Sequence, residues 1–191
     1  MASLNLVVVG VGGQGLITLS TIIAEAAMRR GYGALVAETH GLSQRGGTVV
    51  VHVRLGEVDA PLIPEASADA MLAMELIEAA RYRRYLRPGA VVVANDYVVP
   101  PPLPGVEAPS RDRLVEMLAE RAGRVELVDA TARALRLGDS RTANIVLLGK
   151  ALASGVLAPY VDFEAAAEVI GERFPKARDV NLQALRMGAR G

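Results

Sequence analysis

Cysteine is the most informative absence in this 191-residue chain, which contains none. Without thiolates the chain cannot ligate an iron–sulfur cluster through cysteine, form a disulfide, use a thiol nucleophile or build a cysteine zinc site. Histidine is nearly as scarce, because His40 and His52 are the only two. Two histidines are too few for a histidine-rich metal site, so we expect no metal centre on this chain.

An excess of charge of one sign is also missing. The 21 basic and 21 acidic side chains give a formal net charge of zero. Nucleic-acid-binding proteins usually carry a basic excess, so we expect no nucleic-acid partner. Lys150 and Lys176 are the only lysines, and the other basic residues are arginines. Arginine forks suit carboxylate and phosphate contacts and buried interfaces.

Long hydrophobic runs are absent as well. No apolar stretch reaches the roughly 18 to 20 residues that a membrane span needs. The sequence enters an apolar strand at Leu4 with no basic, cleavable leader before it. We therefore expect a cytoplasmic protein with neither a membrane span nor a signal peptide.

What is present is an alternation of short apolar runs with amphipathic stretches. It predicts an α/β, Rossmann-like domain with a mostly parallel sheet, flanking helices and a helical C-terminal arm. Leu4–Val9 and Gly33–Glu38 are typical of strands and Leu16–Arg30 of a helix, so the chain is predicted to open with a parallel β–α–β unit. We expect one domain over 1–191, with a core over 1–139 and the helical arm over 140–191.

Further along, Thr48–Leu55 is predicted to be a strand, with Val58–Ile63 pairing back on it as a hairpin. Ser110 is the expected cap of a helix over Arg111–Arg121. Asp129 is a candidate cap for the helix that follows it.

The first strand is followed by a glycine-rich turn. Its sequence, Gly10-Val11-Gly12-Gly13-Gln14-Gly15, fits the dinucleotide fingerprint G-x-G-x-x-G between a strand and a helix. Glu38 stands at the end of the second strand, where a ribose-binding acid would be. Three interpretations remain open: a nicotinamide or flavin site, an anion site for a phosphate on another ligand, and a turn that only permits close packing. A P-loop is excluded, because no Gly-Lys-Ser/Thr follows at the required spacing.

The second strand is followed by the most unusual segment of the chain. It runs Glu38-Thr39-His40-Gly41-Leu42-Ser43-Gln44-Arg45-Gly46-Gly47. Open α/β sheets bind ligands at the carboxyl ends of their strands, where this polar segment is expected to lie. A glycine-rich surface connection is the plainer alternative.

These segments, together with Asn144-Ile145-Val146-Leu147-Leu148-Gly149, resemble the gamma-type subunit of 2-oxoacid:ferredoxin oxidoreductases. The sequence Ser43-Gln44-Arg45-Gly46-Gly47 is most similar to that of the beta subunit of indolepyruvate:ferredoxin oxidoreductase. The resemblance covers roughly residues 4 to 155 and is expected to extend over the whole chain. The turn and the loop together are more specific than the turn alone.

The resemblance implies a hetero-oligomeric enzyme of amino-acid catabolism. In that family a 2-oxoacid, here an aryl pyruvate, is decarboxylated on thiamine diphosphate, oxidised through 4Fe–4S clusters to reduce ferredoxin, and released as an acyl-CoA. Thiamine diphosphate and the clusters are expected on the large partner subunit, with CoA as co-substrate. The chain agrees, because it has no cysteine, and Gly138-Asp139-Ser140 departs from a thiamine motif. The chain alone is expected to be inactive and to contain no catalytic residue.

The expected binding face combines the turn and the loop, which we predict to follow adjacent strands and to face one crevice. Glu38 and His40 would position the loop. The face would hold CoA phosphates, close the substrate channel or dock the partner. Its candidate residues are Gly10, Gly12, Gly13, Gln14, Gly15, Ser43, Gln44, Arg45, Gly46 and Gly47.

Three other functions stay open on sequence alone. Within the family, the chain would be the gamma subunit of a pyruvate, ketoisovalerate or 2-oxoglutarate enzyme. Outside it, the chain would be a stand-alone NAD(P)-dependent oxidoreductase or a nucleotide-responsive binding module. The dehydrogenase interpretation lacks an obvious substrate domain, because only about 60 residues follow the predicted last strand near Val128.

Overall fold

A mixed six-stranded sheet forms the centre of the protein, whose structure here is a computed structural model describing residues 3–40, 47–100, 105 and 107–190. The strand order is β2-β3-β1-β4-β5-β6. The neighbours β1, β4, β5 and β6 run parallel, whereas β3 is antiparallel to both β1 and β2. The strands are β1 Leu4–Val11, β2 Ala34–His40, β3 Thr48–Leu55, β4 Ala68–Ala73, β5 Leu86–Asn95 and β6 Arg124–Val128.

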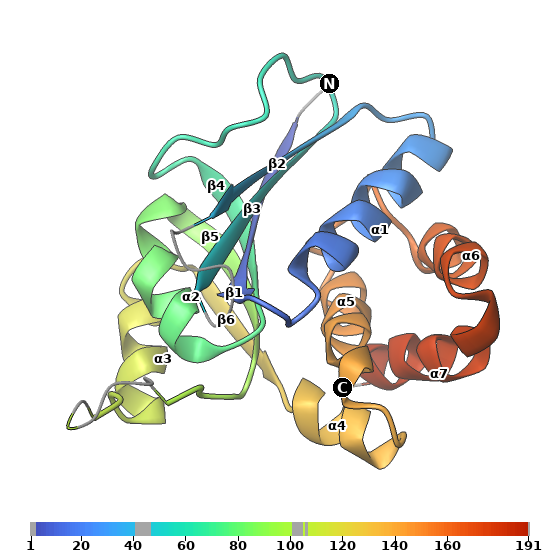
Figure 1. Cartoon of the computed structure of the whole chain (residues 1–191). Coiled ribbons are helices and arrows are strands. Elements are labelled where there is room, and N and C mark those ends of the chain that lie inside the picture. Colours follow the sequence, from blue (N-terminus) through green and yellow to red (C-terminus); the bar gives the residue numbers. More distant parts are fainter. Residues whose placement is uncertain (1–2, 41–46, 101–104, 106, 191) are drawn as a thin grey trace.

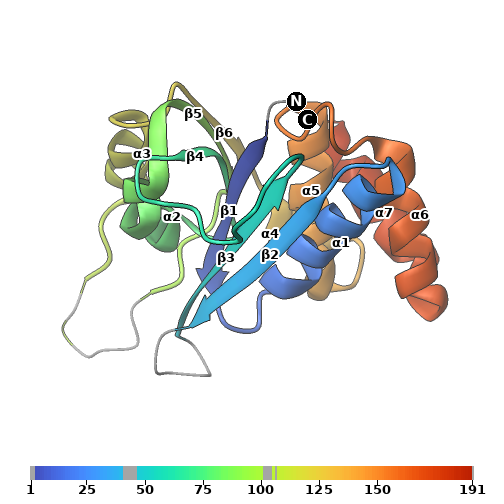
Figure 2. The same ribbon diagram turned by 90° about the horizontal axis from the view of Figure 1, so that it is seen from above.

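Helices cover both faces of this sheet (Figures 1 and 2). On one face lie α2 and α3; on the other, α1 and α5 pack on the strands, while α6 and α7 pack outside them on α1 and α5. The helices are α1 Leu16–Arg29, α2 Leu76–Tyr82, α3 Arg111–Ala119, α4 Ala130–Arg136, α5 Ala143–Ala153, α6 Phe163–Arg173 and α7 Arg178–Ala189, with short 3-10 turns η1 Arg83–Tyr85, η2 Ser140–Thr142 and η3 Pro175–Ala177. The predicted α/β class, with a mostly parallel sheet and C-terminal helices, is confirmed.

The predicted β–α–β opening is correct in its elements but wrong in its pairing. β1 and β2 do not pair with each other, because β3 lies between them and is hydrogen-bonded to both. A strand that enters from a later part of the chain can take that place because its valines are buried on both faces.

The predicted hairpin partner of β3 is also wrong. Residues 56–67 form no strand. Instead, Ile63 is buried, and its backbone N–H donates to Nδ1 of the buried His52, at 3.2 Å. Since both sides of β3 are taken by β1 and β2, no edge remains for Val58–Ile63 to pair with.

Of the two predicted helix caps, one is confirmed. The Ser110 hydroxyl accepts a hydrogen bond from the backbone N–H of Arg113 at the start of α3. Asp129 precedes α4 but caps it with no side-chain hydrogen bond. Its carboxylate pairs with Arg133 and Arg136 instead, because an arginine fork one turn along competes for the same oxygens.

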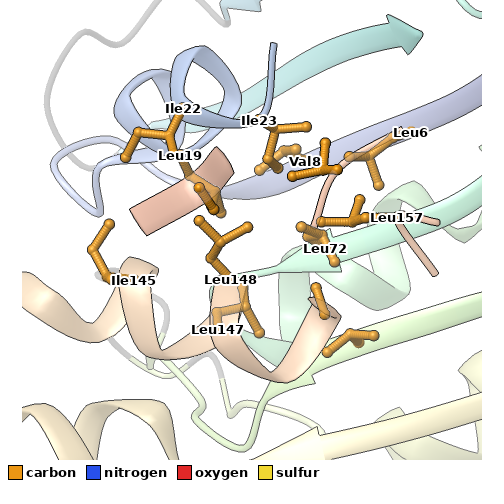
Figure 3. Close-up of a cluster of buried hydrophobic side chains, with 14 of the residues drawn as sticks. Leu6, Val8, Leu19, Ile22, Ile23, Leu72, Ile145, Leu147, Leu148 and Leu157 are labelled. Atoms are coloured by element: carbon orange, nitrogen blue, oxygen red, sulfur yellow. The ribbon is translucent and has the colours of Figure 1, made fainter. Parts of the chain in front are cut away.

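The core between the sheet and its outer helices depends on α1 and α5. Leu19 of α1 points toward Leu148 of α5, as Figure 3 shows, and Ile22, Ile23 and Leu147 belong to the same buried cluster. The buried face of α1 includes Leu16, Leu19, Ile23, Ala26 and Ala27, which recur at helical spacing. Among the described residues no helix is both long and apolar enough to cross a membrane.

Two glycines let α7 approach α5 closely. A Cβ built on Gly188 would lie 1.9 Å from the carbonyl oxygen of Val146, and one on Gly149 would lie 2.1 Å from that of Leu185. Both distances are far below van der Waals contact, so the helix backbones themselves touch. This contact fixes α7 on α5.

Gly188→Ala should therefore destabilise the protein although alanine is the better helix former. Overpacking of this kind costs about 1–3 kcal/mol, which outweighs an alanine gain of roughly 1 kcal/mol. Gly171→Ala in α6 is the matched control, because its Cβ would meet only the flexible side chain of Arg178, at 3.1 Å. Urea unfolding should show a lower midpoint for Gly188→Ala and an unchanged or higher one for Gly171→Ala; equal midpoints would contradict the packing argument.

Candidate functional site

The glycine turn joins the end of β1 to the start of α1. The Gln14 side chain folds back, and its Oε1 accepts the Val11 N–H at 2.8 Å. Gly10 has room for no side chain, since a Cβ there would lie 2.5 Å from that Oε1. Gly13 and Gly15 have φ of +98° and +76°, in the region that favours glycine. The Gln14 contact and the positive φ angles thus define the conformation of the turn from within it.

The first turn of α1 is left open toward solvent or a ligand. Gly15 is the N-cap residue, and no side chain among the described residues caps the helix. The space around a Cβ on Gly13 is empty to 4 Å. Free backbone N–H groups at a helix start attract anions, so the turn has the geometry of an anion site.

A cavity of about 530 Å³ opens beside this turn. Its volume is within the range of roughly 300–1,000 Å³ that is usual for small-molecule sites. It lies at the carboxyl ends of β4 and β5, where Met74 and Tyr97 line it, and is closed by η2, the start of α5 and the start of α7. This is the end of the sheet at which open α/β folds bind ligands.

The lining of the cavity is mostly neutral. Its hydroxyl and amide side chains are Gln14, Thr18, Tyr97, Thr131, Ser140, Thr142, Asn144 and Asn181. The charged groups are Asp139 and Arg141, which pair with each other at 2.8 Å. The hydrogen bond from the Arg141 side chain, and a second from its backbone N–H, hold the pKa of Asp139 below its ordinary value. The cavity therefore offers neutral hydrogen-bonding groups, and the anion-binding groups are at the glycine turn.

Asn144 connects the cavity wall to the glycine turn. Its Nδ2 donates to the carbonyl oxygen of Gly15 at 3.1 Å. The residue is 5% exposed, and its Oδ1 is buried without a hydrogen-bond partner in the described part of the chain. A buried amide oxygen with no partner is costly, so Asn144 Oδ1 is an acceptor that a hydrogen-bond donor of a ligand would satisfy.

Asn95 holds the neighbouring strand ends together. Its Nδ2 donates to the Met74 carbonyl at 3.0 Å and to Thr131 Oγ1 at 2.8 Å, and its Oδ1 accepts from the Thr131 N–H. One amide thus joins the ends of β4 and β5 to the first turn of α4. The floor of the cavity is fixed by this contact.

The structure places only part of the predicted binding face. Gly13, Gln14 and Gly15 line the cavity, and Gly10 and Gly12 belong to the same turn. Ser43, Gln44, Arg45 and Gly46, with the side chain of His40, lie outside the described residues. Gly47 is described, and its carbonyl oxygen accepts the Gly12 N–H at 2.9 Å. The end of the loop therefore meets the turn, although β1 and β2 are not adjacent as predicted.

Comparison with known proteins decides the family. Residues 5–191 match the family described as Pyruvate ferredoxin/flavodoxin oxidoreductase. The chain belongs to this family. The Indolepyruvate oxidoreductase subunit IorB of Archaeoglobus fulgidus is 44% identical over 189 residues, which cover 97% of this chain and 93% of that protein.

More distant relatives support the same family assignment. The Pyruvate/ketoisovalerate oxidoreductases common subunit gamma of Thermococcus kodakarensis is 29% identical over 174 residues, covering 88% of this chain and 85% of that protein. The crystal structure of the gamma subunit of the keto/oxoacid ferredoxin oxidoreductase from Geobacter sulfurreducens has a TM-score of 0.71 and 26% identity, with 98% of this chain and 96% of that chain covered. The resemblance seen in the sequence motifs is therefore confirmed.

The position of Glu38 disfavours a stand-alone dehydrogenase. In a dinucleotide fold the ribose-binding acid follows the strand next to β1. In this family member β3 takes that position, and Glu38 lies one strand further out on β2, opposite Val51. Two strand spacings amount to about 10 Å, which separates Glu38 from the turn that it would have to serve.

Sequence reasoning missed the far wall of the site. In the sequence Asn144 stands out only as part of a family motif, and no pattern distinguishes Asn95, Thr131 or Arg141. Asn144 and Gly15 are 129 residues apart, so no local pattern links them. The one usable signal was an asparagine at the start of an otherwise apolar helix, where it must satisfy a specific hydrogen bond.

We predict that Gly15→Ala and Asn144→Ala are energetically coupled. Alanine at either Gly13 or Gly15 costs about 1–2 kcal/mol of backbone strain. At Gly15 a Cβ would also lie 2.4 Å from Asn144 Nδ2, which adds roughly 1–3 kcal/mol. In an Asn144→Ala background this steric part should vanish.

Urea unfolding of the two single variants and the double variant measures this coupling. Gly13→Ala is the control, since its Cβ meets nothing within 4 Å, and its cost should not depend on residue 144. An equal cost of Gly15→Ala in both backgrounds would show that the contact does not hold the turn.

Proposed function

We propose that the chain is the small, non-cofactor subunit of an indolepyruvate-type ferredoxin oxidoreductase. The observation that carries this proposal is the 44% identity, along nearly the whole chain, to a protein named as a subunit of indolepyruvate oxidoreductase. The identity to a common gamma subunit of pyruvate/ketoisovalerate oxidoreductases is lower, at 29%, so that subunit type is the second candidate. The chain would act as one gamma-type domain over residues 1–191, in which α5 belongs to the buried core and not to a separate arm after residue 139.

The reaction proposed for the complex is the oxidative decarboxylation of an aryl pyruvate to an aryl-acetyl-CoA with reduction of ferredoxin. Thiamine diphosphate and 4Fe–4S clusters belong to the large subunit in this proposal. The absence of cysteine from this chain supports that division, because the chain has no thiolate with which to bind a cluster. No group of three histidine, aspartate or glutamate residues that could hold a metal is found within the described residues.

The part proposed for this chain is to bind and orient CoA next to the large subunit's site. The uncapped start of α1 and the open space at Gly13 suit a phosphate. The neutral amides and hydroxyls of the cavity suit the uncharged, amide-containing remainder of CoA. Ser43, Gln44 and Arg45 would add a hydroxyl, an amide and a guanidinium to the same anion, since Gly47 at the end of the loop is hydrogen-bonded to Gly12 of the turn.

Reconstitution tests the function. The purified chain should reduce neither ferredoxin nor a dye, and adding the large subunit should give reduction that depends on both indolepyruvate and CoA. Activity of the chain alone with NAD would contradict the proposal. Preference for pyruvate over indolepyruvate in the reconstituted enzyme would favour the second candidate.

Arg45→Ala tests the CoA face. Loss of one charged contact should raise the apparent KM for CoA about ten- to a hundredfold, equivalent to roughly 1.5–3 kcal/mol, with the KM for the 2-oxoacid unchanged. Arg121→Ala is the control. Arg121 follows α3, on the face of the sheet opposite the helices α1, α5 and α7 that line the cavity, so both KM values should stay unchanged. If Arg45→Ala splits the complex instead and CoA dependence stays normal in what remains, the loop is an interface.

A further inference from the structure

The arginines of this chain are unevenly neutralised. Most of the described ones form ion pairs, and Arg54 and Arg83 donate side-chain hydrogen bonds. Four make no ion pair or side-chain hydrogen bond with any residue that the structure describes, and three of these belong to α7 or its end. They are Arg121, Arg178, Arg186 and Arg190.

Arg186 and Arg190 line a hollow of about 490 Å³ between α4 and α7. These two helices are in contact in the structure and lie side by side in Figure 1. The other residues that line the hollow are Arg133, Leu137, Gln183 and Met187. Three guanidinium groups and two apolar side chains thus face one space, and none of its lining residues is acidic.

Arg133 fixes one wall of this hollow. Its Nη1 donates to the Met187 carbonyl at 2.7 Å, and its Nε pairs with Asp129. Asp129 is also shared with Arg136, at 3.3 Å, so this acid is not available to Arg186 or Arg190. The guanidinium groups of Arg186 and Arg190 therefore remain exposed and without an ion pair to any described residue, on a wall that Arg133 holds in place.

We infer that this hollow docks an acidic segment of a partner polypeptide, which in the proposed function is the large subunit. This identification of the partner rests on that function. Arg186 lies in the last turn of α7 and Arg190 is its C-cap residue, four positions later. That spacing corresponds to roughly 6 Å along a helix, so the two guanidinium groups can receive two carboxylates in succession. Leu137 and Met187 offer the apolar surface that the aliphatic parts of such a segment need.

A polypeptide fits the hollow better than a small anion does. The open guanidinium groups are exposed and stand along a helix, rather than converging from buried positions around one point. Nearby Leu135 on α4 is 61% exposed, which adds apolar surface beyond the hollow. Arginine and methionine are enriched in protein interfaces, and helix dipoles alone would not require an apolar lining beside the arginines.

Docking at this place would connect the partner to the candidate site. α7 is fixed on α5 through Gly149 and Gly188, and the starts of both helices line the cavity, with Asn144 and Asn181. A partner held at the end of α7 therefore stands against the rigid pair of helices that forms the cavity wall.

The test is a charge reversal, Arg186→Glu with Arg190→Glu, in the full chain. Binding to the large subunit should weaken about ten- to a hundredfold, and its dependence on salt should become shallower. Arg121→Glu is the matched control, because Arg121 is also exposed and has no ion pair with a described residue, but it follows α3 on the opposite side of the sheet. The Arg121→Glu variant should bind the large subunit within about twofold of wild type. Thermal unfolding of all three proteins checks that the fold is kept.

A second probe separates this inference from the proposed function. A fluorescein-labelled peptide of alternating glutamate and leucine should bind the wild-type chain and not the double variant. If the peptide binds in this way but the large subunit does not bind even the wild-type chain, the partner and the proposed function are wrong and the acidic-segment site stands. If the double variant binds the large subunit as tightly as wild type, or if millimolar inorganic phosphate alone displaces the peptide, the docking inference is overturned.

Discussion

The contact between Gly15 and Asn144 is the constraint on which the site depends. It brings the start of α1 and the start of α5 within one hydrogen bond, 3.1 Å long, although 129 residues separate them. The same two helices supply the side chains at the centre of the core (Figure 3). Because α7 is fixed on α5 by backbone contact at Gly149 and Gly188, three helices hold one wall of the cavity in place. An open helix start can be kept ready for an anion only if its surroundings are this rigid.

The sequence predicts the opening of the chain well because that part is local. The run of valines, the glycines after it and the apolar spacing of α1 each specify their own segment. In the structure β1 ends two residues later than predicted, and α1 starts at the predicted Leu16 and ends one residue earlier than predicted. The pairing of β3 could not be predicted in the same way. Which strand lies between β1 and β2 is decided by long-range packing, and Thr48–Leu55 satisfies it with a strand buried on both faces.

The candidate site also has one part that local sequence predicts and one part that depends on long-range packing. The glycine turn is recognisable from spacing alone, since positive φ at Gly13 and Gly15 demands glycine. The opposite wall is built from single polar residues of later elements, such as Thr131 at the start of α4 and Asn181 in α7. Neither residue forms a recognisable pattern within its own helix. Only the folded structure shows that both line the cavity.

In the proposed function this chain binds CoA at the glycine turn and at the cavity wall opposite it, and the redox chemistry belongs to the partner subunit. Amide hydrogen exchange of this chain in the reconstituted complex, with and without CoA, tests this role. CoA should slow exchange at residues 12–18 and 140–146, which border the cavity, with little change on α2 and α3. Unchanged exchange at both segments, with CoA protection confined to the large subunit, would contradict CoA binding by this chain.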